Sequence, residues 1–406
     1  MKINKVTLLG HKDHGKSTLI GNMLITSGAA SEQRINEAKK TSRKLGRRFE
    51  PGYILDSFEE ERQGEMTIDT TRAQVKYRDV AFEFIDVPGH EELIKNMISG
   101  ASYASFALLI VSAKADEGIR PQTKRHIFLA KMLGIDRIIV AVNKMDTIGY
   151  DEKEFERIKG ELGEFLGGVG IRNDNVYFVP ISAYNAENLS AKSPNMKWYK
   201  GKPLLDVMRT VVKSNEEVED PHLRILLQGT IPHETGSMLI GNVLSGSIRS
   251  GQRIMILPEG ANATVKDLFV KGSRTKSAST GENVAMLLDK PISREPRGSV
   301  IYSEGSRQRP SDEIKATVFL TKEIGEKITV RFNGSNLQGK IAINSLIDTT
   351  TGSREAPKSG NYALNAADVN IKLGKKIQAE PFTDSRELGR FVLYEGSKFA
   401  GIGIIK

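Results

Sequence analysis

The stretch VTLLGHKDHGKSTLIGNMLIT, residues 6–26, determines how the N-terminal part of this chain folds. It begins with a short apolar run typical of a buried strand and ends with a helix-like segment from Lys16 to Thr26. Between them, Gly10 to Ser17 fit the pattern G-x-x-x-x-G-K-[ST], whose glycines allow main-chain N–H groups to surround a phosphate. We therefore predict a phosphate-binding loop at a strand–helix junction.

The side chains of this loop match what a nucleoside triphosphate requires. We expect the Lys16 ammonium to reach the β- and γ-phosphates, where it offsets negative charge and assists catalysis, and the Ser17 hydroxyl to bind Mg²⁺. The predicted phosphate contacts are His11, Lys12, Asp13, His14, Gly15, Lys16, Ser17 and Thr18.

Apolar, strand-like runs alternate with helix-like segments through the N-terminal half of the chain. The strand-like runs are 6–10, 80–86, 106–113, 137–144 and 176–182, and the helix-like segments are 16–26, 91–100, 122–133 and 152–166. This alternation predicts an α/β domain with a mostly parallel sheet and helices on both faces. Ligands of such sheets bind beyond the carboxyl ends of the strands, so the loops after the strands are expected to carry the chemistry.

A second motif, DVPGH, runs from Asp86 to His90 at the end of a predicted strand. We expect the Asp86 carboxylate to hold a Mg²⁺-bound water and the Gly89 amide to contact a γ-phosphate. His90 would then lie where a water attacks that phosphate, and we predict that it orients the water. The alternative is a loop histidine without a catalytic role.

A third motif, NKMD, runs from Asn143 to Asp146 and also follows a strand. A carboxylate at Asp146 accepts paired hydrogen bonds from the N1–H and the exocyclic amine of guanine, a donor pair that adenine lacks. The motif therefore predicts GTP and GDP as ligands rather than adenine nucleotides. The predicted base-binding residues are Asn143, Lys144 and Asp146, together with Ser182, Ala183 and Tyr184, where a main-chain amide is expected to meet the guanine oxygen.

The character of the chain changes near residue 215. The segment SNEEVEDP, residues 214–221, is polar and acidic and ends in proline, which is typical of a linker. Beyond it, short β-rich runs interrupted by glycines predict two β-barrels, with a second boundary at 303–313. The predicted organisation is a P-loop GTPase domain at 1–213, followed by barrels at 222–305 and 311–406.

Composition and charge exclude several classes of protein. The chain has no cysteine, which excludes disulfides, thiolate metal sites and thiol nucleophiles. Its apolar runs are far shorter than the roughly 20 residues of a membrane span, so we expect a cytoplasmic protein without a membrane partner. Residues 1–220 carry 33 basic and 32 acidic side chains, so the net charge of +9 lies mostly beyond them.

One segment of the N-terminal half is an exception to this balance. The tract KKTSRKLGRR, residues 39–48, has six basic residues in ten and no acidic one. Two interpretations are open: a solvated face of a helix, or a contact with RNA or with an acidic partner subunit.

The segments DHGKSTLIGNML, EERQGEMTIDTT, DVPGHEELIKNMISGAS and NKMD together resemble the translation-factor class of GTPases. Two groups fit best, elongation factor 1-alpha and the GTPase (large) subunit of sulfate adenylyltransferase, and the resemblance covers nearly the whole chain. It implies two β-barrels after the GTPase domain. It also implies that Thr67 joins Ser17 and Asp86 in holding Mg²⁺ and that a partner accelerates GTP hydrolysis.

Details of the resemblance favour the sulfate-activation subunit. TIDTT at 67–71 and the C-terminal sequence 387–406 resemble that group, and Asn242 and Ser245 stand where tRNA-carrying members usually have Arg and Glu. The expected partner is then a small catalytic subunit that makes the adenylyl–sulfate bond. The alternatives are an elongation factor 1-alpha-like protein that works with the ribosome and tRNA, and a GTP-dependent scaffold without useful turnover.

The sequence departs from the family pattern at two places. Lys12 occupies a phosphate-loop position that is usually Val in the family, which we expect to alter intrinsic hydrolysis. The order Gly64-Glu65 also differs from the usual one, which bears on the conformation of the switch segment around Thr67.

Overall fold

The computed structural model describes residues 3–46, 48–55, 71–86, 104–213, 220–234, 236–290, 297–356 and 363–406. The predicted site residues Thr67, Gly89 and His90, and the predicted helix at 91–100, lie outside these ranges and stay predictions. The chain divides by its internal contacts into two compact units, Met1–Glu216 with Asp348–Ser353, and Glu217–Ile347 with Arg354–Lys406. Each unit is described by itself below.

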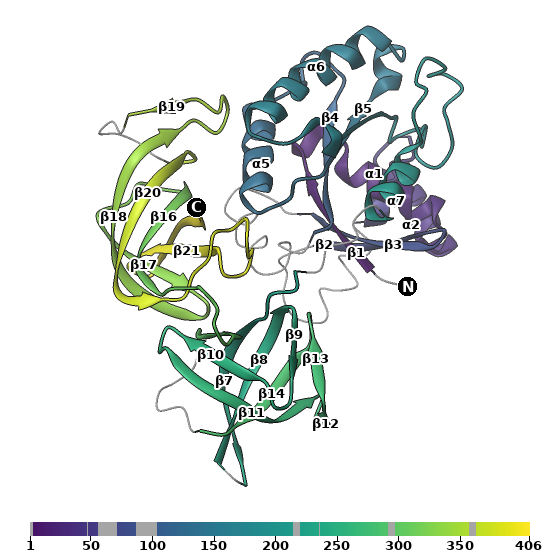
Figure 1. Ribbon diagram of the computed structural model, residues 1–406. Coiled ribbons are helices and arrows are strands. Elements are labelled where there is room, and N and C mark those ends of the chain that lie inside the picture. Colours follow the sequence, from purple (N-terminus) through teal and green to yellow (C-terminus); the bar gives the residue numbers. More distant parts are fainter. Residues whose placement is uncertain are drawn as a thin grey trace. The chain divides into compact units, whose positions relative to one another are not determined.

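The first unit contains a six-stranded sheet with the order β2-β3-β1-β4-β5-β6 (Figure 1). All neighbouring strands run parallel except β2 and β3, which confirms the predicted mostly parallel sheet. Its strands are β1 (Ile3–Leu9), β2 (Thr71–Tyr77), β3 (Val80–Asp86), β4 (Phe106–Ser112), β5 (Ile138–Asn143) and β6 (Val176–Pro180).

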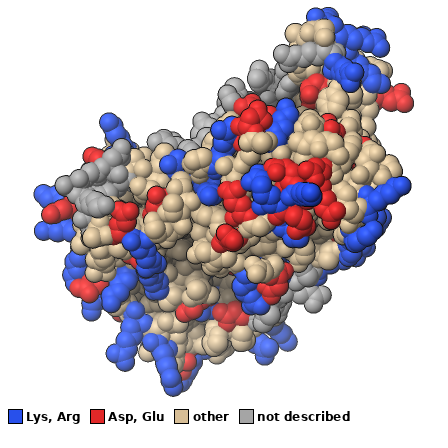
Figure 2. All heavy atoms as spheres, turned by 90° about the horizontal axis from the view of Figure 1, so that it is seen from above, with Lys and Arg blue, Asp and Glu red and all other residues tan. Residues whose placement is uncertain are grey.

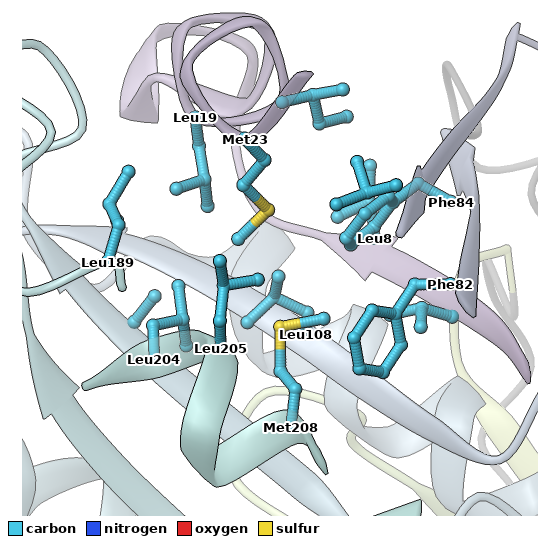
Figure 3. Close-up of a cluster of buried hydrophobic side chains, with 14 of the residues drawn as sticks. Leu8, Leu19, Met23, Phe82, Phe84, Leu108, Leu189, Leu204, Leu205 and Met208 are labelled. Atoms are coloured by element: carbon cyan, nitrogen blue, oxygen red, sulfur yellow. The ribbon is translucent and has the colours of Figure 1, made fainter. Parts of the chain in front are cut away.

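Helices cover both faces of this sheet, with α5 and α6 on the opposite side from α1 and α7 (Figure 1). Alternate residues of a strand point to opposite faces, so Leu8 packs with α1 and α7 whereas Leu9 points away from them. Figure 3 shows the resulting core, where Leu19 and Met23 of α1 converge with Met208 of α7. The helices are α1 (Lys16–Thr26), α2 (Glu32–Lys44), α5 (Pro121–Met132), α6 (Glu152–Gly168) and α7 (Leu204–Lys213).

Three of these elements were not predicted: α2, α7 and the edge strand β2. β2 pairs with β3 through a tight turn in which Arg78 has a φ of 52°, and Thr71 lies opposite Asp86. The two strands of this antiparallel hairpin are joined by a tight turn with no helix between them, so the alternation of strands and helices that revealed the other strands does not mark β2. Helix α2 includes the first part of the basic tract at 39–48.

The second unit begins with a β-barrel that is closed because β10 pairs back with β11. The barrel order is β10-β15-β7-β8-β14-β11, while β12 extends from β11, and β9 and β13 form a separate two-stranded ribbon. The strands are β7 (Arg224–His233), β8 (Gly236–Ser245), β9 (Ser247–Arg249), β10 (Arg253–Leu257), β11 (Ala261–Val270), β12 (Ser273–Thr275), β13 (Ser277–Ser279), β14 (Asn283–Leu288) and β15 (Val300–Ser303).

A second barrel follows in the order β17-β21-β22-β16-β20-β18, closed by pairing of β17 with β18 and extended by β19. Together the two sheets confirm the predicted pair of β-barrels; their residue boundaries stay predictions. The strands are β16 (Ser311–Leu320), β17 (Lys327–Phe332), β18 (Ser335–Ile347), β19 (Arg354–Glu355), β20 (Ala366–Ile377), β21 (Arg390–Glu395) and β22 (Lys398–Ile405).

A buried polar cluster joins the two barrels. The Arg224 guanidinium of the first barrel donates from Nε to both carboxylate oxygens of Glu380, at 3.0 and 2.8 Å. The Tyr302 hydroxyl donates a 2.7 Å bond to the same carboxylate, which is 1% exposed. Ser245, noted above as a family departure, accepts a bond from Arg224 at 3.1 Å. Residue 245 therefore contributes to the joint between the barrels.

Charged side chains of both signs are mixed on the face of the molecule in Figure 2, where Lys and Arg lie beside Asp and Glu. The basic side chains on that face do not form one continuous positive patch. The described helices all fall short of the length and apolarity that a membrane span requires.

Candidate nucleotide site

The predicted motif loops that the structure describes lie at one edge of the sheet, after the carboxyl ends of β1, β5 and β6. Of the DVPGH motif, Asp86 is the last residue of β3. Gly10 directly follows β1 and has a φ of +135°, and a Cβ placed on it would lie 2.4 Å from the main-chain oxygen of Ile110. Only glycine therefore lets the phosphate loop leave β1 so close to β4. The loop then makes a short 3-10 helix, η1 (Lys12–His14), before α1 begins.

The N-terminus of α1 provides the unpaired N–H groups that favour an anion. Ser17 lies exposed in its first turn, and its hydroxyl has no hydrogen-bond partner among the described residues, so it is available to a metal ion. The Thr18 hydroxyl is already used, because it donates a 2.7 Å bond to Glu50 Oε1. Thr18, a predicted phosphate contact, can therefore offer only its main-chain N–H to a phosphate.

His14 faces the interior of the domain. Its ring is 1% exposed, and Nδ1 lies 3.2 Å from the oxygen of Ile110. Burial lowers the pKa of His14, so the ring is neutral near pH 7. His11 is partly exposed, with Nδ1 3.5 Å from a carboxylate oxygen of Asp13. A phosphate would therefore meet the main chain at His14 rather than its ring.

Asn143, the first residue of the NKMD motif, connects the base-binding and phosphate-binding loops. Its Nδ2 donates a 2.8 Å hydrogen bond to the main-chain oxygen of His14. Its Oδ1 accepts a 2.8 Å bond from the main-chain N–H of Ala183. The side chain is 2% exposed, so both bonds are shielded from water.

The second motif residue, Lys144, has a φ of 66° and pairs with Glu117, a residue that the sequence did not single out. Lys144 Nζ lies 2.5 Å from Glu117 Oε2, and both side chains are about one-fifth exposed, at 22% and 21%. Burial alone would raise the pKa of Glu117, but hydrogen bonds from Lys144 and Ser112 lower it to about 2. Glu117 therefore holds the Lys144 side chain in one position beside the predicted base site.

Asp146 lies in a short 3-10 helix, η3 (Met145–Ile148), and is partly exposed. Its carboxylate makes no hydrogen bond or ion pair with any residue that the structure describes. This carboxylate lies beside the hydrogen-bonded phosphate and base loops, so it fits the role of an acceptor for the donor groups of guanine.

The SAY segment, Ser182 to Tyr184, is held from two sides. The Ala183 N–H is taken up by Asn143, so that amide is already occupied where we expected an amide to face the guanine oxygen. Asn22 of α1 donates to the main-chain oxygens of both Ala183 and Tyr184. Asn22 is the polar residue within the apolar stretch 19–25 of α1, and that position was the signal available in the sequence.

Glu187 ties the SAY segment to the end of the NKMD loop. Its carboxylate accepts bonds from Tyr150 at 3.1 Å, Ser193 at 2.9 Å and Asn195 at 3.0 Å. The main chains of Ser182 and Glu187 also form a pair of hydrogen bonds, at 3.0 and 3.3 Å. The predicted base-binding loops are therefore connected to each other by several hydrogen bonds.

Comparison with known proteins gives the same picture. Residues 1–215 match the family described as "Elongation factor Tu GTP binding domain", and residues 315–406 match "GTP-eEF1A C-terminal domain-like". The chain is 32% identical to elongation factor 1-alpha of Aeropyrum pernix over 98% of this chain and 95% of that protein.

The chain belongs to the elongation factor Tu/1-alpha family of translation-factor-class GTPases.

Two further elongation factors 1-alpha match at a similar level, and one solved structure covers the chain at lower identity. Elongation factor 1-alpha of Sulfurisphaera tokodaii is 33% identical and that of Methanothermobacter thermautotrophicus 31%, each over 98% of this chain and 95–96% of its own length. A crystal structure of sup35 complexed with GDP covers 100% of this chain and 93% of its own, with 20% identity and a TM-score of 0.43. The preference for a sulfate adenylyltransferase subunit has no support from these relatives.

Three residues, Ser17, Thr67 and Asp86, are the predicted Mg²⁺ ligands. Asp86 ends β3, but its side chain, like that of Lys12, lies outside the described part of the chain. Within that part, no group of three His, Asp or Glu side chains could hold a metal ion by itself. Ser17, whose hydroxyl is exposed, is the predicted Mg²⁺ ligand whose side chain the structure describes, and it fits the role.

Proposed function

We propose that this chain is a GTP-hydrolysing translation factor of the elongation factor 1-alpha type, which works with the ribosome and tRNA in the cytoplasm. One observation carries the nucleotide part: Asn143 joins the phosphate loop to the base loop, while the Asp146 carboxylate beside it bonds to none of the described residues. Identity of 31–33% to elongation factors 1-alpha along 98% of the chain supports the translational part. The predicted domain boundaries, 1–213, 222–305 and 311–406, belong to this proposal.

The hydrolysis mechanism follows from motif roles and from the family resemblance. Ser17, Thr67 and Asp86 would hold Mg²⁺, which would supply charge stabilisation to the phosphates. Lys16 and the amides of residues 11–18 offset the remaining negative charge, and the Gly89 amide contacts the γ-phosphate. His90 orients the attacking water by position, since phosphoryl transfer through a loose transition state depends mainly on positioning and electrostatics.

Guanine selectivity is tested with Asp146→Asn. We expect the variant to lose GTP affinity and to gain affinity for xanthosine triphosphate, because the amide then meets a carbonyl where the amine was. Unchanged GTP affinity in calorimetric titrations would remove Asp146 from the site. Lys16→Ala should abolish tight binding in the same titrations, whereas His90→Ala should slow hydrolysis and leave affinity nearly intact.

The cellular role is tested by the partner that stimulates hydrolysis. In this proposal ribosomes accelerate GTP cleavage by roughly 10³–10⁵-fold. Stimulation instead by a co-purified adenylylating subunit would support the sulfate-activation role that Asn242, Ser245 and the segment at 67–71 favoured. Absence of single-turnover cleavage with every partner would indicate a GTP-dependent scaffold.

A further inference from the structure

The C-terminal half of α2 presents a group of unpaired cations. Lys39, Lys40, Arg43 and Lys44, with Arg48 just beyond the helix, are all exposed and are called the basic face of α2 below. None of the five forms an ion pair or hydrogen bond through its side chain with any described residue. No acidic residue occurs between Glu37 and Glu50.

Helix α6 of the same unit shows the usual alternative. There Arg157 pairs with Glu154 at 2.7 Å and Glu161 at 3.3 Å, and Lys159 pairs with Glu156 at 2.9 Å. Such i,i+3 and i,i+4 pairs cancel charge within one helix and need no outside partner. Among the residues that the structure describes, the basic face of α2 has no such cancellation of charge.

The geometry of the helix places these cations on one continuous strip. Lys39 and Arg43, and likewise Lys40 and Lys44, are four residues apart, so each pair shares a face and is separated by about 6 Å along the axis. Ala38 and Ser42 lie on the other side of the helix and are 2% and 1% exposed. Cations in the last turn of a helix are stabilised by the helix dipole. This effect would account for Arg43 and Lys44, but not for Lys39, Lys40 or Arg48.

The residue composition of the basic face of α2 favours a nucleic acid over a protein as its binding partner. The cores of protein–protein interfaces are depleted in lysine and enriched in aromatic and apolar side chains. Leu45, 56% exposed, is the large apolar side chain that lies beside the basic face. Phosphate backbones are bound by lysine and arginine strips without an apolar centre.

We propose that the basic face of α2 binds the phosphate backbone of an RNA, independently of its base sequence. The choice of RNA over DNA rests on the proposed translational function, whereas the choice of a nucleic acid backbone rests on the unpaired cations. The surface lies outside the nucleotide site, so it would add an RNA contact without changing the affinity for GTP.

The test measures the anisotropy of a short fluorescein-labelled single-stranded RNA titrated with the full-length, GDP-loaded protein at several salt concentrations. Lys40→Gln/Lys44→Gln should weaken binding at least ~5-fold near 0.1 M salt and lower the salt slope by about 1.4, since each lost phosphate contact on a single strand removes about 0.7. Lys40→Arg/Lys44→Arg keeps both charges and should bind as tightly as the unchanged chain. A second RNA of scrambled sequence should give the same values.

The matched control is Arg157→Gln/Lys159→Gln, which removes the same charge from α6. If it weakens RNA binding as much as the α2 variant, the effect is one of net charge and the proposal is wrong. Tighter binding of poly-glutamate than of RNA would overturn it in favour of an acidic protein partner. Thermal unfolding and GDP affinity of each variant identify a folding defect; should the α2 double variant be unstable, Lys40→Gln alone, with an expected slope change of about 0.7, decides the question.

The experiments distinguish a failure of the proposed translational function from a failure of the proposed RNA-binding surface. Loss of ribosome stimulation in the unchanged chain, with the α2-dependent RNA binding intact, would contradict the translational role and leave the RNA surface standing. Normal ribosome stimulation without α2-dependent RNA binding would have the opposite meaning.

Discussion

Asn143 Nδ2 donates a 2.8 Å hydrogen bond to the main-chain oxygen of His14, which lies 129 residues earlier in the chain. The same side chain accepts from the N–H of Ala183 at 2.8 Å. One buried amide thus connects the loops after β1, β5 and β6. The phosphate and the base of a nucleotide would therefore bind to a single preassembled unit.

Removing this amide should weaken both the fold and the ligand site. Asn143→Ala leaves the oxygen of His14 and the N–H of Ala183 buried without partners, at about 1–3 kcal/mol for each group. We expect the free energy of unfolding to fall by about 2–5 kcal/mol and GDP to dissociate faster. Urea denaturation and stopped-flow release of a fluorescent GDP analogue measure the two effects. Asn175→Ala, in the short helix η4 (Asn173–Asn175) away from the predicted loops, serves as a control.

The tolerance of position 15 to a side chain is limited by Asn143. It has a φ of +88°, and a Cβ there would lie 2.5 Å from Asn143 Nδ2. Gly28 has a similar φ of +70° with no atom within 4 Å of its Cβ position. Gly28→Ala should cost about 1–2 kcal/mol of unfolding free energy from backbone strain alone. Gly15→Ala should cost more, because it also displaces Asn143; equal losses in denaturation experiments would mean that the contact is unimportant.

Glu117 should act on the nucleotide through Lys144. Glu117→Gln removes the charge that holds Lys144 Nζ at 2.5 Å, so we expect faster GDP release without loss of the fold. The control is Glu161→Gln, which affects an exposed pair with Arg157 on α6. An unchanged GDP dissociation rate in Glu117→Gln would show that the orientation of Lys144 does not matter for binding.

The same carboxylate predicts a pH dependence of stability. The pKa of Glu117 is lowered from 4.5 to about 2, so its contribution is fully present above about pH 4.5 and is lost as the pH falls toward 2. The difference in unfolding free energy between the unchanged chain and Glu117→Gln should therefore shrink across this window. A difference that stays constant from pH 5 to pH 2 would contradict the low pKa.

The joint between the barrels should be sensitive to loss of one charge. Glu380→Gln removes the buried one of the two carboxylates that pair with Arg224, which is 8% exposed and keeps its ion pair with Asp220. Loss of hydrogen bonds between charged groups should cost about 1.5–3 kcal/mol. Glu395→Gln breaks the exposed pair with Lys322 and should change stability far less. Differential scanning calorimetry on the full chain compares the two; equal shifts would show that burial of the Arg224–Glu380 pair is unimportant.

The sequence alone was sufficient for the class of the fold and for the motif loops. Apolar runs such as Phe106–Ser112 are buried at every position, and their alternation with helices gives a parallel sheet wherever local periodicity is strong. The same local signals placed the phosphate loop and NKMD at strand ends. They did not reveal β2, because an edge hairpin has no helix between its two strands. They gave a helix at 39–48 only as one interpretation and did not show the extent of α2, because that helix is mostly polar and charged and buries only Ala38 and Ser42.

The tertiary structure alone decided the contacts between residues that are distant in the sequence. The bonds from Asn143 to His14 and Ala183, the pairing of Lys144 with Glu117, and the buried Arg224–Glu380 pair each join segments whose separation no local pattern encodes. Burial of these polar groups demands a partner, but the identity of that partner depends on how the strands assemble. Sequence therefore determined which residues could meet a nucleotide, and packing determined which of them are already bound to one another.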